Sequence, residues 1–264
     1  MKKRFLTLAA LALLFAGLNS CSKNDPTVTN ELGLSAEIKA KITALGFGAE
    51  DAFAVEGGYI VENDIFIANE DLDKPMNLAH SLIVGDEEQY RTTNLVTGLP
   101  RTITVSRDNT FSTTAKAAIT AAIARYNAEN LQLTFQEVGS GGNIHIKRVN
   151  GGNYIASAGF PSGGNPYNQV KFNKTYENYS LGFVTTVIAH EMGHCIGFRH
   201  TDYANRSYSC GSGGNEGDGG VGAIHIPGTP TTHAVPNSWM LACLSATTDR
   251  PFISSDKVAL DYLY

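Results

Sequence analysis

Three closely spaced histidines constrain this chain more than any other feature. Of its seven histidines, three fall in the segment "VTTVIAHEMGHCIGFRHTD", at His190, His194 and His200. In a helix, residues four apart lie one turn above each other, so His190 and His194 can face one metal ion. Gly197 can adopt a left-handed backbone that ends the helix and turns the chain back, which would bring His200 to the same ion. The spacing predicts a helix over about 181–198 that ends in a three-histidine metal site.

Glu191 adds a chemical function to this site. Three neutral imidazoles leave a fourth position open, which is the arrangement of a catalytic zinc site. Zinc lowers the pKa of a bound water from about 15.7 to about 7. Glu191, beside the first histidine, would take that proton during attack on a peptide carbonyl and pass it to the leaving amine. One catalytic Zn²⁺ and a general base at Glu191 are therefore predicted, the alternative being a solvated helix whose histidines bind no metal.

The segment from His190 to His200 matches the extended motif HExxHxxGxxH and resembles the metzincin metallopeptidases. With Met192-Gly193 inside the motif, it looks closest to the protease B-like HEIGH metallopeptidases. The resemblance implies a zinc endopeptidase that cleaves proteins or peptides, with the three histidines as ligands. It also implies a Met-turn, a tight turn that places a methionine beneath the metal; Met240 in "NSWML" is the candidate.

The implied fold is α+β: a zincin catalytic domain with a twisted mixed sheet, a long active-site helix and the Met-turn. We expect this domain over residues 99–264. It would open with a strand and a long helix within 101–130, place a cleft-edge strand near 154–159, and close with a helix near 255–263. A small α+β region over 34–98, with a helix near 34–45 and a hairpin over 59–68, precedes it as a prosegment or an accessory domain.

The N-terminus indicates export. A basic cap and an apolar run over 5–18 are typical of a signal peptide, here residues 1–20. The segment ends in Leu18-Asn19-Ser20-Cys21, which resembles a bacterial lipobox and predicts a lipidated Cys21 followed by a tether over 21–33. The chain would then be lipid-anchored to a membrane of the cell envelope, at the outer membrane or cell surface. The net charge of −5 gives no indication of a nucleic-acid partner.

Latency, if the chain has it, cannot use a cysteine, because none lies between residues 22 and 194. A carboxylate, such as one in "NEDLDK" (69–74), or simple steric cover would have to serve instead.

The other cysteines and acidic residues give weaker expectations. If Cys21 carries lipid, three cysteines remain and three pairings are open; Cys210 with Cys243 is preferred, and Cys195 is core or disulfide-bonded. Asp202 either bonds the Met-turn backbone near Ser238 or is solvated. The "GNEGDGG" loop (214–220) has few acidic residues, so Ca²⁺ is only weakly supported there.

Two questions of function stay open on the sequence. Ala242 stands where some metzincins have an oxyanion-stabilising tyrosine, so this role would fall to zinc or to a tyrosine such as Tyr203. One alternative function is zinc-dependent hydrolysis of a substrate other than protein. The main alternative is a non-enzymatic, zinc-binding envelope lipoprotein, either an adhesin or a binding module. Glu191 argues against it, because three histidine ligands need no adjacent carboxylate.

Overall fold

The computed structural model describes residues 33–73, 89–217, 220–231 and 235–264. The predicted signal peptide, Cys21 and nearly all of the tether lie outside these ranges. Residues 33–264 form one compact unit. Its first elements are one helix and three short strands: α1 (Ala36–Ala44), β1 (Phe53–Val55), β2 (Gly58–Val61) and β3 (Ile65–Ala68).

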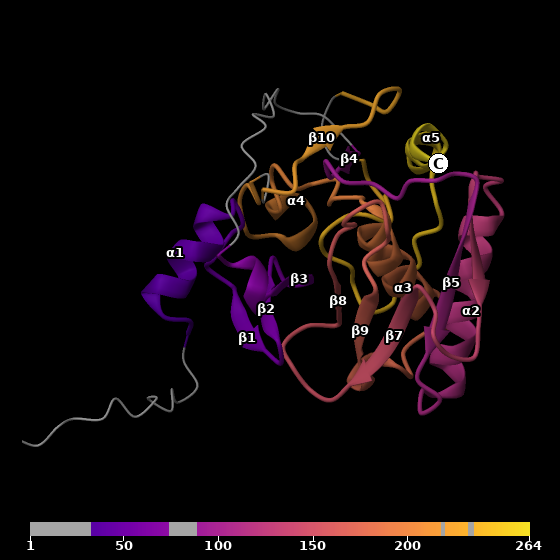
Figure 1. Cartoon of the computed structure of the whole chain (residues 1–264), viewed down its shortest axis with the longest axis horizontal. Helices are drawn as coiled ribbons and strands as arrows, with labels where there is room; N and C mark the ends of the chain where they lie inside the picture. The colour runs from indigo at the N-terminus through magenta and orange to yellow at the C-terminus, as the bar shows by residue number, and fades with distance from the viewer. Residues whose placement is uncertain (1–32, 74–88, 218–219, 232–234) are drawn as a thin grey trace, which may run out of the picture. The chain divides into compact units, whose positions relative to one another are not determined.

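An eight-stranded mixed sheet forms the framework (Figure 1). Its order is β1-β2-β3-β8-β9-β7-β5-β6, where the later strands are β5 (Arg101–Arg107), β6 (Leu133–Glu137), β7 (Ile144–Val149), β8 (Ala156–Ala158) and β9 (Gln169–Asn173). Strands β9, β7, β5 and β6 run parallel, whereas β8 runs antiparallel to β9. The predicted α+β class with a mixed sheet is confirmed.

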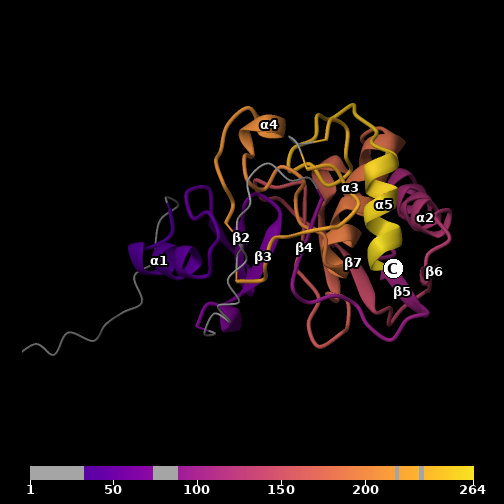
Figure 2. The ribbon, with the colours of Figure 1, turned by 90° about the horizontal axis from the view of Figure 1, so that it is seen from above.

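Two long helices pack against each other beside the sheet (Figure 2). Helix α2 (Thr113–Asn127) begins at Ser112, whose hydroxyl accepts from the Ala115 N–H. Its apolar stripe enters the main core, with buried side chains at Ala115, Ala118, Ile119, Ala122, Ile123 and Tyr126. Helix α3 (Leu181–Ile196) is buried along almost its whole length, so it has no side that faces solvent. The chain ends in α5 (Ser254–Leu263).

Strand β8 is not a sheet edge, contrary to the expectation for residues 154–159. Strand β3 runs parallel to it, pairing Ile65 with Ala158, and the Ala158 N–H donates to the Asp64 carbonyl at 3.0 Å. The sequence pattern of β8 could not reveal this, because the covering strand comes from about ninety residues earlier in the chain. The N-terminal hairpin β2–β3 thus covers the edge on which a cleft was predicted.

The N-terminal region has its own small core, which includes Ile42, Phe47, Val61 and Ile65. It nevertheless shares the sheet with the rest of the chain, so the boundary between residues 98 and 99 is not a boundary of the sheet. Whether this region is a prosegment or an accessory domain stays a prediction.

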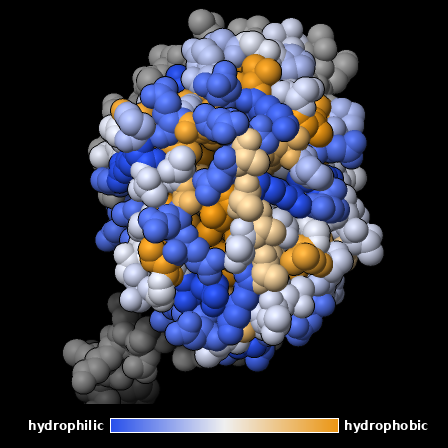
Figure 3. All heavy atoms as spheres, turned by 90° about the vertical axis from the view of Figure 1, so that its right-hand side faces the viewer, coloured by the Kyte–Doolittle hydropathy of each residue, from blue (hydrophilic) through white to orange (hydrophobic). Residues whose placement is uncertain are grey.

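The remaining described elements are short: β4 (Tyr90–Arg91), β10 (Ile224–His225), α4 (Ser207–Cys210) and the 3₁₀ helices η1 (Asn69–Asp71) and η2 (Lys174–Tyr176). Strands β4 and β10 pair with each other. No helix in the described ranges combines the length and apolar character needed to cross a bilayer. On the side of the molecule that carries α2, apolar residues form a narrow strip between hydrophilic ones (Figure 3).

Candidate active site

Helix α3 carries the first two histidines, and a glycine turn delivers the third. The helix starts at Ser180, whose hydroxyl accepts from the Phe183 N–H at 3.3 Å. It ends at Gly197, which has φ of 111°, the left-handed conformation expected from the sequence. The N–H groups of Gly197 and Phe198 both bond to the Gly193 carbonyl, which reverses the chain and brings His200 back to the helix.

The Nε2 atoms of the three predicted ligands converge on one point. The Nε2 atom of His200 lies 3.2 Å from that of His194 and 3.3 Å from that of His190. A tetrahedral zinc with bonds of about 2.0–2.1 Å places its ligand atoms about 3.3 Å apart, so these residues fit the ion. All three rings are buried.

The other nitrogen of each ring fixes its tautomer. The Nδ1 atoms lie next to acceptors: the Trp239 carbonyl at 2.8 Å for His190, the Phe198 carbonyl at 2.8 Å for His194, and a Glu216 carboxylate oxygen at 2.7 Å for His200. Each Nδ1 therefore donates its proton, so that in the neutral ring Nε2 is the nitrogen whose lone pair is available to a metal.

Glu191 lies beside this centre without being part of it. Its side chain is buried, and within the described ranges its Oε2 atom has no hydrogen-bond partner. Burial, and then the charge of Asp64, raises the pKa of this carboxyl group well above its ordinary range. A buried carboxylate with an unpaired oxygen beside three metal ligands is placed to accept a proton.

Met240, the Met-turn candidate, packs against helix α3. It is fully buried, and its Sδ atom would be 2.7 Å from a Cβ built on Gly193, in the helical turn between His190 and His194. The Met240 carbonyl accepts from the Thr201 N–H at 2.9 Å. The turn therefore contacts both the helix and the segment that follows the third histidine.

A family model described as "Dual-action HEIGH metallo-peptidase" matches residues 59–264. The chain belongs to this family. The predicted class, a metallopeptidase and hence a hydrolase, is confirmed at this level, and the ligand set suits zinc. The match begins within the N-terminal region, so the hairpin β2–β3 belongs to the part that the family shares.

Solved structures resemble this HEIGH metallopeptidase only in part. Two of myroilysin match with 19% and 12% identity and TM-scores of 0.33 and 0.43, covering 46% and 65% of this chain and 54% and 96% of theirs. The hatching-enzyme zinc-protease HCE-1 of the medaka fish Oryzias latipes matches with 17% identity and a TM-score of 0.29, covering 39% of this chain and 47% of its own. This chain thus spans about half the length of the first of them. A search of curated proteins gives no significant match.

Asp202 and Asp256 hold the Met-turn of the HEIGH metallopeptidase from two sides. One Asp202 oxygen accepts from the Ala242 N–H at 2.9 Å and the other from the Ser209 hydroxyl at 2.6 Å. Of the two alternatives for Asp202, the structure shows a bond to the backbone after Met240. The bond is made at Ala242, however, and not near Ser238. Asp256 takes that place: it accepts from Gln89 Nε2 at 2.6 Å, Ser238 Oγ at 2.7 Å, Ile253 N at 3.0 Å and Trp239 N at 3.3 Å.

Asp256 is expected to make stability depend on pH. Burial raises its pKa from 3.8 to about 6, although its four hydrogen-bond donors lower it. Between these values the native state holds a proton that the unfolded state has lost, so this contribution to stability falls as the pH rises. The shift corresponds to about 3 kcal/mol. The free energy of unfolding of the native sequence, minus that of Asp256→Asn, should decrease by about 2 kcal/mol from pH 4 to pH 7 in urea titrations, because at pH 4 more than half of the unfolded chains have already lost this proton; a constant difference would contradict the assignment.

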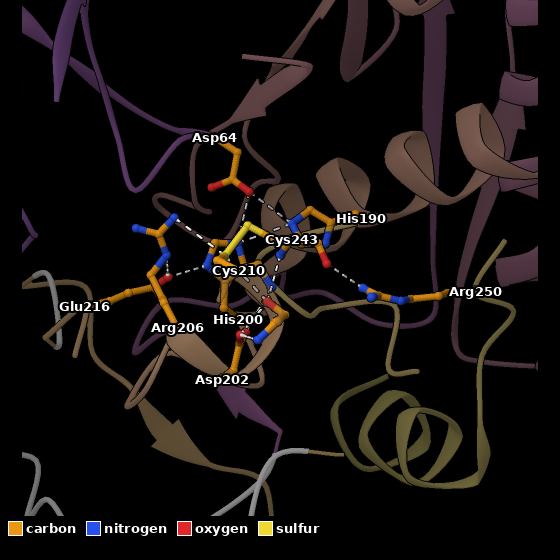
Figure 4. The surroundings of a disulfide bond; sticks show 11 residues. Asp64, His190, His200, Asp202, Arg206, Cys210, Glu216, Cys243 and Arg250 are labelled. Atoms are coloured by element: carbon orange, nitrogen blue, oxygen red, sulfur yellow. Dashed lines mark hydrogen bonds and ion pairs between the residues drawn. A yellow bond between two sulfur atoms is a disulfide. The ribbon is translucent and has the colours of Figure 1, made fainter. Parts of the chain in front are cut away.

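Asp64 is the site residue that the sequence did not reveal. Its Oδ2 atom lies 3.1 Å from His200 Nε2 and 3.4 Å from His190 Nε2, at the fourth corner of the ligand cluster (Figure 4). The pKa of this carboxyl group is held below its ordinary range by the three histidines, although burial opposes them. In the sequence, Asn63-Asp64 looks only like a turn. The stretch 69–73 from which a carboxylate was expected lies elsewhere, and Asp73 pairs with Lys41 at 2.9 Å.

Glu216 is a second such residue. It comes from the glycine-rich loop that was weighed for calcium, and its carboxylate bonds the third ligand, His200. Arg206 lies 3.1 Å and Arg199 3.6 Å from the same carboxylate. A carboxylate already held by a histidine and two arginines orients a ligand. Asp218, the other acidic residue of the loop, lies outside the described residues.

The remaining predicted residues have structural surroundings. Cys210 and Cys243 form a disulfide, the pairing preferred from the sequence, and Cys195 is a buried free thiol. Tyr203 packs its ring on Tyr90 at 4.3 Å. Tyr154, not Tyr203, lines the cavity next to His190.

Proposed function

We propose that this protein is a zinc-dependent endopeptidase, with His190, His194 and His200 as ligands and Glu191 as general base and acid. The observation that carries the proposal is that the three Nε2 atoms converge on one point and that the buried carboxylate of Glu191 lies beside them. Membership of a metallopeptidase family supports it. A zinc-binding module without activity would need the three rings but not Glu191.

The side chains divide the work of peptide hydrolysis. When bound, zinc would polarise the substrate carbonyl and lower the pKa of water, so that the water can lose a proton and act as a nucleophile at neutral pH. Glu191 accepts the proton of the attacking water at its unpaired oxygen and delivers it to the departing amine. Trp239 and Glu216 hold the rings of His190 and His200 through their Nδ1 atoms, so that the Nε2 atoms stay aimed at the metal.

Metal removal tests the proposal. Treatment with a chelator should abolish cleavage of casein, and stoichiometric Zn²⁺ should restore it, because no other electrophile is present among the site residues described. The full chain and a chain from which the residues before the catalytic part have been cut should both be assayed. A chain that binds one zinc and cleaves neither casein nor a peptide library would favour the binding-module alternative.

We further propose that the hairpin β2–β3 keeps the enzyme latent. Asp64 reaches the fourth corner of the ligand cluster, where the water and the substrate carbonyl would have to bind. The Asp64 carbonyl also bonds the Ala158 N–H of β8, a backbone group that an extended substrate would use. The hairpin thus occupies both the metal position and the neighbouring strand edge.

The cellular location is also a proposal. The basic cap, the apolar run and Leu18-Asn19-Ser20-Cys21 support export and lipidation, which would anchor the enzyme to the cell envelope. Metabolic labelling with a radioactive fatty acid should mark the native chain but not Cys21→Ser, and labelling of both chains, or of neither, would contradict lipidation at this residue.

A further inference from the structure

A cavity of about 320 Å³ opens next to the first zinc ligand. Helix α3 forms one wall with Thr186, Val187 and His190, and the segment after the Met-turn, Leu241–Leu244, forms another. Because a ligand of the metal lines it, a substrate side chain in this cavity would belong to a residue next to the scissile bond. What lines the cavity therefore helps to select substrates.

Arg250 places a cationic side chain in this cavity. Its Nη1 atom donates to the Cys243 carbonyl at 3.0 Å, while its Nε atom is buried and has no hydrogen-bond partner in the described part of the chain. No carboxylate of the described residues lies within ion-pair distance of it. By contrast, the neighbouring Arg125 bonds Asp249.

The position of Arg250 is fixed by its backbone. Its N–H donates to the Thr186 hydroxyl of α3 at 2.8 Å, and its carbonyl accepts from Arg125 Nη1 at 3.2 Å. Figure 4 shows the side chain pointing from the side opposite Glu216 toward His190 and the disulfide. The backbone of Arg250 is thus fixed, while its half-buried guanidinium uses only part of its hydrogen-bonding capacity. Such a group is suited to bind an anion that arrives with the substrate.

We propose that Arg250 determines specificity and selects substrates that carry a carboxylate next to the scissile bond. This inference rests on the proposed peptidase function. The part of the guanidinium that lines the cavity would bind a carboxylate through charge-assisted hydrogen bonds. The carboxylate has two sources, the side chain of an aspartate or glutamate and the free C-terminus of a peptide.

The test uses fluorogenic peptides and the full chain with Asp64→Ala, which opens the proposed metal position. Each position flanking the cleaved bond carries glutamate, glutamine or leucine in turn, and every peptide is made with both a free and an amidated C-terminus. At one flanking position, kcat/KM should be roughly 10- to 100-fold higher for glutamate than for glutamine. If this preference instead requires the free C-terminus, the terminal carboxylate is the group recognised.

Variants assign the preference to Arg250. Arg250→Leu should bring the glutamate-to-glutamine ratio to about one, and Arg250→Lys should retain part of it, because lysine keeps the charge without the fork. Arg107→Leu is the matched control. Arg107 ends strand β5, lies outside the cavity and pairs with Glu137 of β6, so its loss should leave the glutamate-to-glutamine ratio unchanged.

Failure of this inference is distinguishable from failure of the proposed function. Chelator-sensitive cleavage with equal rates for glutamate and glutamine at every position would overturn the role of Arg250 while the peptidase stands. If no peptide is cleaved either by this chain or by the chain from which the hairpin has been cut, the peptidase proposal fails. Binding of the same labelled peptides to the Glu191→Gln, Asp64→Ala chain, measured by fluorescence anisotropy, then decides whether Arg250 selects carboxylates.

Discussion

Glu191→Gln should lower kcat by roughly 10²- to 10⁴-fold and leave the zinc content at one ion per chain. Glutamine has nearly the same shape but cannot accept the proton of the attacking water. The three histidines keep their Nδ1 partners in this variant, because none of them is Glu191. The measurement is turnover of a quenched peptide together with metal analysis of the purified chain.

The matched control is Glu177→Gln. Glu177 is also buried, but it does not belong to the histidine cluster: it forms an ion pair with Arg148 at 2.7 Å. Loss of its charge should therefore affect stability more than turnover. A Glu191→Gln chain that cleaves at the native rate would show that the base is another group, and the proposed mechanism would be wrong. Loss of zinc from this variant would instead indicate that Glu191 stabilises the metal site.

Asp64→Ala should raise the activity of the full chain toward a small peptide by at least roughly tenfold. The carboxylate competes for the fourth corner of the metal site, so the apparent affinity for substrate equals the intrinsic affinity multiplied by the fraction of molecules in which the carboxylate has left that corner. The hairpin itself should stay in place, because Val61 and Ile65 are buried in the small core. The backbone carbonyl of residue 64 would still bond the Ala158 N–H of β8 in this variant. Cleavage of casein should therefore increase less than cleavage of the small peptide.

A spectroscopic measurement separates this role from a general loosening of the fold. In the Co²⁺-substituted full chain, the visible spectrum should change on Asp64→Ala, because a carboxylate ligand is replaced by solvent. Asp73→Ala is the control in the same region, since Asp73 pairs with Lys41 and does not reach the histidines. Equal activity and equal spectra in the native and Asp64→Ala chains would remove the latency proposal.

The sequence was most informative where function depends on local spacing. The i, i+4 pair, Gly197 and the third histidine lie within one helix and one turn, so their geometry follows from helix periodicity and backbone sterics. Met240 could be placed because the resemblance supplied the distance at which to look.

The sequence was uninformative where a side chain reaches the site from far away. Asp64 meets His200 across 136 residues, and Glu216 comes from a glycine-rich loop without periodicity. Nothing in either local pattern distinguishes a turn or loop carboxylate from one aimed at a metal. The edge position expected for β8 was wrong for the same reason, because only the assembled sheet shows which strand lies beside it.

Under the latency proposal, the pairing of β3 with β8 has a consequence for a chain from which the hairpin has been removed. Removal of the hairpin would leave β8 as a new sheet edge, and exposed edges invite pairing with other chains. This strand, however, is only three residues long, Ala156–Ala158, and one of its two sides stays bonded to β9. An edge of that length can align a short peptide segment, but it is a poor template for aggregation of the shortened chain.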